Sequence, residues 1–149
     1  MVKKDELLIR LYNPSDEKAV IELWHECGLI VPHNDPEIDI EKKIQFQSQW
    51  FFVGVVNGRI GSTVMVGYEG HRGWINYLAV SPDLQRRGYG KQMMERAEAV
   101  LKKVGCLKIN LQIRETNKKV IFFYRSLGYS EDNVISMGKR LDGNNNEIL

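Results

Sequence analysis

A loop that could hold a phosphate group is the most informative chemical feature of this sequence. It reads Gln85-Arg86-Arg87-Gly88-Tyr89-Gly90-Lys91 and lies between an apolar stretch and a segment with helical spacing. Backbone N–H groups at a helix N-terminus lack partners within the helix and favour a bound anion. The two glycines let a bulky phosphate approach the backbone closely, and three cations lie in the same stretch. Together these residue types predict a phosphate-binding loop.

Two common phosphate-binding loops do not fit this stretch. The sequence lacks the Gly-x-x-x-x-Gly-Lys-Ser/Thr run of nucleotide-hydrolysing proteins, and Gly88-Tyr89-Gly90 lacks the third glycine of the dinucleotide fingerprint. The alternative for Arg86 and Arg87 is ordinary solvated surface charge, and for the glycines a tight helix start.

Hydrophobic spacing predicts the elements around the loop. The Asn57-Gly58 pair predicts a hairpin between β-rich segments, and Asp35 followed by Pro36 predicts a capped helix with Ile40 and Ile44 on its inward side. We expect strands at residues 7–11, 50–56, 59–66, 74–80 and 107–113, with a last one within 132–141. We expect helices over residues 15–27, 36–47, 89–104 and 117–127.

Composition limits the class of protein. With 149 residues, 43% hydrophobic and 27% charged, the chain has the size and make-up of one soluble globular domain. A formal net charge of +2 gives no reason to expect nucleic acid as a partner. Cys27 and Cys106 have neither disulfide nor metal spacing, and no secretion signal or membrane span is evident, so we expect a cytoplasmic protein without a metal or a membrane partner.

The apolar strand, the turn with Pro82 and the Gln-x-x-Gly-x-Gly run together resemble the acetyl-coenzyme A signature of the Gcn5-related N-acetyltransferase (GNAT) superfamily. Asn117 and the run Val-Ile-Phe-Phe-Tyr-Arg-Ser-Leu-Gly-Tyr at residues 120–129 resemble a later block of that superfamily. Within it, the chain is similar to small bacterial acetyltransferases of the YpeA type at residues 34–40, 70–73 and 138–141.

The resemblance implies a fold. We expect an α+β protein in α/β/α layers, with a mixed central sheet of six to seven strands splayed into a V and about four flanking helices. It would form a single N-acetyltransferase domain over residues 1–149, with an ordered core at about 7–141 and a frayed tail. A homodimer through the sheet edge near residues 132–141 is a further expectation.

The resemblance also implies an activity, the transfer of an acetyl group from acetyl-coenzyme A to a primary amine by direct attack in a ternary complex. The cofactor-binding residues would be Leu78, Ala79, Val80, Gln85, Arg86, Arg87, Gly88, Tyr89, Gly90, Lys91 and Asn117. For the strand residues the contact would come from the main chain, which pairs with the pantetheine arm like an added strand. Asn117 could equally cap the helix that follows it.

Tyr124 matches the position of the general acid in the superfamily. A phenol with a pKa of about 10 stays protonated at neutral pH and can donate to a thiolate leaving group; the alternative is a helix aromatic in the core. Glu69 or His71, acting through water, is the candidate base, and for each the alternative is a solvated loop residue. The acceptor pocket could be lined by Trp24, His33, Asn34, Asp35 and Tyr77.

The sequence does not identify the acceptor. We expect a small-molecule amine. The alternatives are a protein N-terminus or lysine as acceptor, or a non-catalytic coenzyme A-binding regulatory domain.

Overall fold

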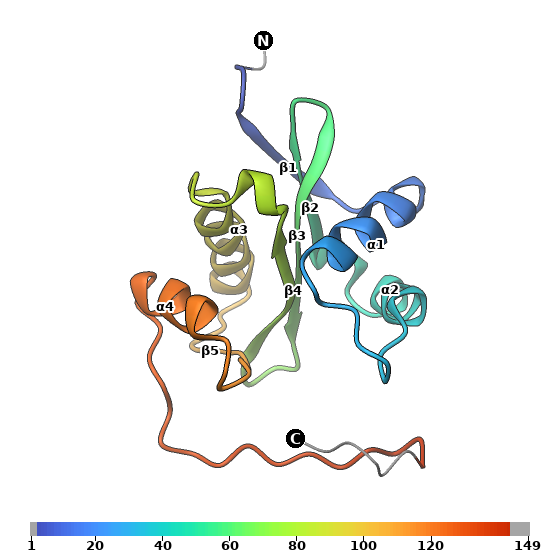
Figure 1. The fold of residues 1–149 in the computed structure, drawn as a ribbon. Helices are drawn as coiled ribbons and strands as arrows, with labels where there is room; N and C mark the ends of the chain where they lie inside the picture. Colours follow the sequence, from blue (N-terminus) through green and yellow to red (C-terminus); the bar gives the residue numbers. More distant parts are fainter. Residues whose placement is uncertain (1–2, 144–149) are drawn as a thin grey trace. The chain divides into compact units, whose positions relative to one another are not determined.

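The computed structural model describes residues 3–143 of the chain (Figure 1). Contacts divide it into two compact units, Met1–Gln112 and Ile113–Leu149. From residue 144 on, the expected frayed tail lies outside the described residues. The single-domain organisation stays a prediction.

A five-stranded sheet forms the centre of the first unit. Its strands lie in sequence order: β1 (Leu7–Leu11), β2 (Phe51–Val56), β3 (Arg59–Tyr68), β4 (Gly73–Val80) and β5 (Ile109–Asn110). The first four pair antiparallel, and β5 pairs parallel with β4. The hairpin between β2 and β3 turns at Asn57 and Gly58, both with positive φ, as expected for such a tight turn.

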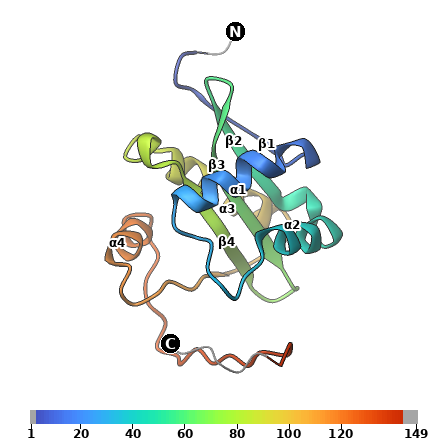
Figure 2. The same cartoon turned by 45° about the vertical axis from the view of Figure 1, so that its right-hand side comes forward.

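Helices cover both faces of this sheet. Helices α1 (Glu17–Glu26) and α2 (Pro36–Gln45) lie on one face, and α3 (Tyr89–Lys103) lies on the other (Figures 1 and 2). Three short 3-10 turns, Pro14–Asp16, Ser48–Trp50 and Pro82–Leu84, precede α1, β2 and the phosphate-binding loop. The expected α/β/α layering is therefore present in the first unit.

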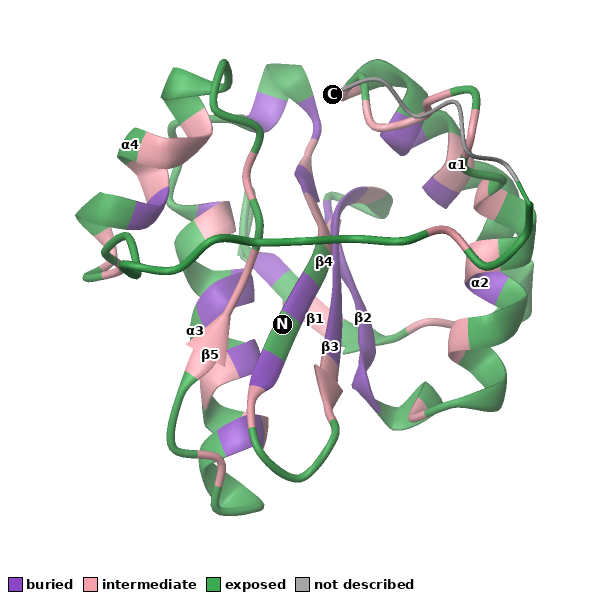
Figure 3. Ribbon diagram, turned by 90° about the horizontal axis from the view of Figure 1, so that it is seen from below, coloured by how far each residue is buried: buried purple, intermediate pink, exposed green. Residues whose placement is uncertain are grey.

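Buried residues lie on the sheet and on the helices at both of its faces (Figure 3). On the side of α1 and α2 the core cluster consists of Val20, Leu23, Trp24, Ile40, Phe51, Val53, Met65 and Ala79. On the other side, α3 buries Met93, Met94, Ala97 and Leu101 at helical spacing. Ile40 is buried as expected, but Ile44, which we expected to face inward beside it, is 42% exposed. The buried face of α2 therefore does not include Ile44.

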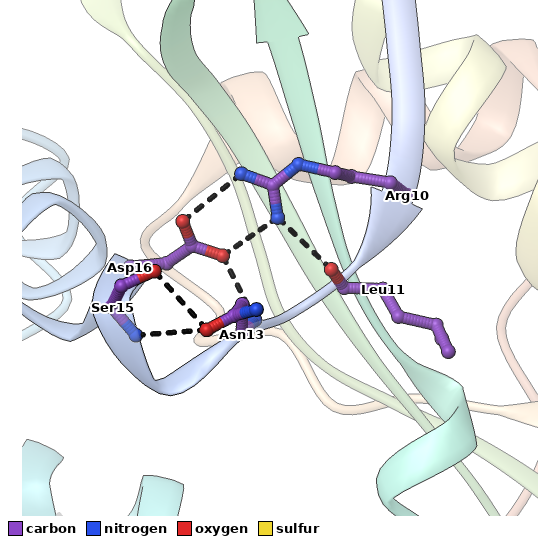
Figure 4. A network of polar contacts seen from close by, with 5 residues as sticks. All are labelled: Arg10, Leu11, Asn13, Ser15 and Asp16. Atoms are coloured by element: carbon purple, nitrogen blue, oxygen red, sulfur yellow. Dashed lines mark hydrogen bonds and ion pairs between the residues drawn. The ribbon is translucent and has the colours of Figure 1, made fainter.

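A polar network fixes the corner between β1 and α1 (Figure 4). Asp16 is buried, and its carboxylate accepts hydrogen bonds from both terminal nitrogens of Arg10, at 2.7 and 3.0 Å, and from the Asn13 N–H at 2.9 Å. Asn13 in turn accepts from the N–H of Ser15. The hydrogen bonds from Arg10 hold the pKa of Asp16 below its ordinary value.

Among its described residues, the second unit has one helix, α4 (Lys118–Ser126), which ends before Gly128 with its φ of 95°. The strand expected within residues 132–141 is not formed, and the one expected at 107–113 is reduced to β5. The described sheet therefore has five strands rather than six to seven. Val134 and Ile135 have high β-propensity, but that preference depends on burial against neighbouring side chains, and these two side chains are 75% and 89% exposed. The four expected helices are present.

Within the described residues, no helix is both long and apolar enough to cross a membrane.

Candidate active site

The edge of β4 is open along most of its length. β5 pairs with β4 only at Gly73 and Trp74, so residues 76–80 have β3 on one side and no paired strand on the other within the described residues. An unpaired edge presents N–H and C=O groups that an extended ligand can pair with. The predicted divergence of the sheet is thus found on the edge of the strand that leads to the phosphate-binding loop.

β4 carries a bulge in the middle of this open stretch. Thr63 and Met65 of β3 are opposite Ala79 and Asn76 of β4, so β4 holds one residue more than β3 between these pairs. Tyr77 lies in this interval with a φ of 50°. A positive φ is strained for a bulky side chain and persists only where the surroundings hold it.

Three contacts hold Tyr77 in this conformation. Its ring stacks on Trp24, with centroids 3.8 Å apart, and its carbonyl accepts a hydrogen bond from the Thr63 hydroxyl at 2.8 Å. The same hydroxyl accepts from the Trp24 indole at 2.9 Å. The Tyr77 hydroxyl donates to Asp39 Oδ2 of α2 at 2.5 Å. Burial, and then the hydrogen bond to Asp39, raise the pKa of Tyr77, which therefore stays a protonated donor.

The phosphate-binding loop reaches α3 through two residues with positive φ, Arg86 at 66° and Gly88 at 83°. Gly88 is the N-cap residue of α3, and no side chain caps this N-terminus. A Cβ added at Gly88 would have no heavy atom within 4 Å, so the space beside the helix N-terminus is open. Uncapped N–H groups next to open space can bind an anion.

The charged side chains of the loop are available to a ligand, whereas some of its neighbours are held by the protein. Arg86, Arg87 and Lys91 are exposed. Gln85 donates its amide to the Val80 carbonyl at 3.0 Å. Tyr89 is buried and its hydroxyl donates to the Asp5 carbonyl, so only its main chain can serve a ligand.

The strand residues expected at the cofactor differ in exposure. Leu78 and Val80 are half-buried, whereas the Ala79 side chain lies in the core. Cys27 also contacts the end of β4, since its thiol donates to the Val80 carbonyl at 3.3 Å. Burial raises the pKa of Cys27, which keeps it a thiol.

The two candidate bases lie away from the open edge. Glu69 accepts the N–H groups of His71 and Arg72 and thereby closes the turn between β3 and β4. From this turn to Leu78 is about 20 Å along β4, at roughly 3.3 Å a residue. The structure does not bring Glu69 or His71 together with the strand segment expected to hold the thioester.

The residues expected to line the acceptor pocket have different surroundings. Trp24 is completely buried and supports Tyr77 instead of offering a surface. Asp35 caps α2, accepting the N–H groups of Glu37 and Ile38 at 2.9 and 3.3 Å, which confirms the predicted cap. Asn34 is exposed and His33 is half-exposed, in the loop before α2.

The second unit contains the remaining two predicted residues. Asn117 caps α4 by accepting the Val120 N–H at 3.4 Å, so the capping alternative is observed. Tyr124 is buried, with edge-on ring contacts to Phe123 and Tyr129. Burial raises the pKa of Tyr124, so its hydroxyl keeps its proton at neutral pH.

Sequence reasoning missed a polar row from α2 to the sheet. Asp39 bonds Tyr77, Lys43 donates to the Val66 carbonyl, and the Gln47 amide bonds both main-chain groups of Tyr68, at 2.8 and 3.2 Å. Burial lowers the pKa of Lys43 to about 8. The spacing of four residues between Asp39 and Lys43 was the available signal, because such residues share one face of a helix. Gln47 lies beyond the end of α2, with a φ of 59°.

Comparison with known proteins decides the family. The sequence model of the Acetyltransferase (GNAT) family matches residues 11–129. The chain belongs to this family. An acetyltransferase of Pectobacterium atrosepticum is 46% identical over 133 residues, which cover 89% of this chain and 94% of that protein. The chain is therefore an acetyl-coenzyme A-dependent N-acetyltransferase.

Solved structures share the fold of this GNAT protein at lower identity. The ribosomal-protein-S18-alanine N-acetyltransferase from Escherichia coli superimposes with a TM-score of 0.70 at 22% identity, over 85% of this chain and 79% of that chain. AAC(6')-Iy in complex with the bisubstrate analogue CoA-S-monomethyl-acetylneamine gives a TM-score of 0.73 at 19% identity, over 91% of this chain and 99% of that chain.

The residues present fit coenzyme A. The uncapped α3 N-terminus with open space at Gly88 suits a diphosphate, and the exposed cations of the loop suit its charge. The open edge of β4 suits the amide groups of a pantetheine arm.

Proposed function

We propose that this acetyltransferase acetylates the primary amine of a small molecule by direct attack on acetyl-coenzyme A in a ternary complex. The observation that carries the proposal is the continuity of one surface: the open edge of β4 leads into a loop that ends at an uncapped helix N-terminus. This arrangement supports a ligand with a strand-like arm and an anionic end.

In this proposal the main chain makes most contacts to the cofactor. Leu78 would pair its N–H and C=O groups with the pantetheine arm, and Val80 would offer its N–H, since the Val80 carbonyl already accepts from Gln85 and Cys27. The N–H groups of residues 86–91 would bind the diphosphate. Arg86, Arg87 and Lys91 would add charge at the same place. Asn117 would contribute only in addition to its capping role.

The bound cofactor supplies an activated thioester, and Tyr124 would assist the departure of its thiolate. A thiol has a pKa of about 8.5 and a free phenol one of about 10, so the phenol stays protonated at neutral pH and can stabilise the leaving thiolate by donating a hydrogen bond. The raised pKa of Tyr124 keeps this donor protonated throughout the neutral range. No cysteine nucleophile is needed, in keeping with the raised pKa of the half-buried Cys27 thiol.

The proton of the attacking amine would leave through water. Glu69 is engaged in closing its turn, and about 20 Å of β4 separates this turn and His71 from Leu78, where the thioester is expected. Neither position supports the role of a base.

The arrangement of α2 favours a small acceptor over a protein. Its Asp39 reaches the bulge of β4 and bonds Tyr77, so the helix partly covers the sheet face next to the open edge. A peptide acceptor would need an uncovered groove there. The AAC(6')-Iy complex joins coenzyme A to a small amine, whereas the S18 enzyme is named for a protein substrate. A homodimer and a cytoplasmic location stay predictions.

Calorimetric titration with acetyl-coenzyme A tests the cofactor half of the proposal. Gly88→Glu places a carboxylate at the expected diphosphate position and should reduce affinity at least 100-fold, a loss of about 2.7 kcal/mol. Gly58→Glu is the matched control, since Gly58 also has a positive φ, 78°, and open space at its Cβ. Equal affinity in the two variants would refute the loop assignment.

Thiol release from acetyl-coenzyme A, measured with a panel of amines and peptides, tests the acceptor half. We expect turnover with small amines and none with peptides. Turnover confined to peptides would favour the protein acetyltransferase alternative, and cofactor binding without any turnover would favour a regulatory domain.

A further inference from the structure

We propose that Asp39 binds a second cationic group of the acceptor, so that the preferred substrates are small molecules with two or more amines. This inference rests on the proposed function, because it requires the thioester to lie along the open edge of β4. It adds a specificity-determining residue and a substrate class.

The carboxylate of Asp39 is half-buried and lacks a cationic partner. Its Oδ2 accepts from Tyr77, while no described residue donates to Oδ1 or forms an ion pair with it. Lys43, one turn further along α2, donates its ammonium to the Val66 carbonyl instead. A partly desolvated carboxylate with a free oxygen attracts a cation more strongly than a fully solvated one.

The Asp39 carboxylate is positioned by Tyr77, a residue with a strained backbone. Tyr77 has a positive φ in the middle of a strand, and contacts from Trp24, Thr63 and Asp39 hold it there. Strained backbone conformations persist only where the surrounding structure holds them, and they are found most often at functional sites. The hydroxyl of Tyr77 orients Oδ2, which leaves Oδ1 for another donor.

The same face of β4 carries an exposed aromatic ring. Trp74 and Asn76 are opposite Gly67 and Met65 of β3, and Met65 belongs to the core layer under α1 and α2. Both Trp74 and Asn76 are exposed. An indole ring and a carboxylate on one sheet face both favour organic cations.

The reach of the Tyr77 side chain separates a second cation from the reacting amine. From standard bond lengths, its hydroxyl lies roughly 6–7 Å from its own Cα, and Asp39 is 2.5 Å beyond that hydroxyl. This is too far for Asp39 to take a proton directly from an amine at the strand edge. A cation held on the near side of Asp39 would lie about 6–9 Å from the strand, which suits two amines joined by about five carbons, roughly 7–8 Å apart when extended.

Acetyl transfer to two acceptors of equal length tests the inference: 1,5-diaminopentane and n-pentylamine. We expect the wild-type kcat/KM for the diamine to exceed that for the monoamine about 10–100-fold, as for one charge-assisted hydrogen bond. In Asp39→Asn this ratio should fall to about two, the statistical factor for two equivalent amines. The affinity for coenzyme A should not change.

Two controls separate recognition from structure. Asp39→Asn keeps an oxygen that can accept from Tyr77, so a purely structural role predicts an unchanged ratio. Glu37→Gln removes the same charge from the exposed side of the first turn of α2 and should keep the wild-type ratio.

A wild-type ratio near two, or an Asp39→Asn ratio equal to that of wild type, would overturn the inference. The same holds if neither probe is acetylated while other amines of the panel are; in each of these cases the proposed function would stand. A wild-type protein that binds no acetyl-coenzyme A, or acetylates no amine, would instead reject the proposed function and the inference with it.

Discussion

The hydroxyl of Thr63 offers a direct test of how the bulge in β4 is held. Thr63 and Trp24 are both completely buried, and this hydroxyl accepts from the Trp24 indole while donating to the Tyr77 carbonyl. Thr63→Val keeps the shape of the side chain and removes both hydrogen bonds. The indole N–H then has no partner, and the Tyr77 carbonyl loses its donor.

The expected cost follows from these two losses. An unsatisfied buried donor costs about 1–3 kcal/mol, and a lost hydrogen bond contributes about 0.5–1.5 kcal/mol. We therefore expect Thr63→Val to lower the free energy of unfolding by about 2–4 kcal/mol. Thr63→Ser keeps the hydroxyl and loses one buried methyl, for which we expect about 1 kcal/mol.

Urea denaturation followed by tryptophan fluorescence measures both variants. Since Tyr77 lies in the bulge beside the open edge, kcat/KM should fall further in Thr63→Val than in Thr63→Ser. If Thr63→Val is no less stable than Thr63→Ser, the hydrogen bonds of Thr63 do not hold the bulge, and the reasoning fails.

Two further changes test other parts of the chain. Tyr124→Phe should lower kcat about 10²–10⁴-fold with little change in the affinity for coenzyme A, as measured by steady-state kinetics and calorimetry; an unchanged kcat would remove Tyr124 as the general acid. Asp16→Asn should destabilise the protein by about 1–3 kcal/mol at pH 7, because it weakens charge-assisted hydrogen bonds to Arg10. Since the native pKa of Asp16 is depressed, this stability is present above the unfolded pKa of about 3.9 and is lost as the pH falls through the native value. Urea titrations should therefore show the stability difference between Asp16→Asn and wild type shrinking below about pH 4. A difference that stayed constant with pH would contradict the role of the Asp16 charge. As a control, Glu131→Gln, in an exposed ion pair with Arg125, should change the free energy of unfolding by less than about 1 kcal/mol.

Short-range signals in the sequence predicted most of the elements. The Asn57-Gly58 turn, the Asp35 cap and the helix start at Gly88 each depend on residues only a few positions apart. The same is true of the phosphate-binding loop and of the family resemblance. Where a strand needed pairing with a distant segment, the prediction was wrong: residues 132–141 form no strand.

The residues that meet at the bulge were decided by the tertiary structure alone. Asp39 and Tyr77 are 38 positions apart, and Trp24 and Thr63 are 39 apart. Their contacts depend on the register of β3 against β4 and on the packing of α1 and α2 on the sheet. No local pattern encodes such a register, because shifting a strand by one residue moves every side chain to the other face without changing the sequence. The sequence by itself determined the family and the start of α3 after Gly88. Only the tertiary structure placed Asp39 beside Tyr77 at the bulge.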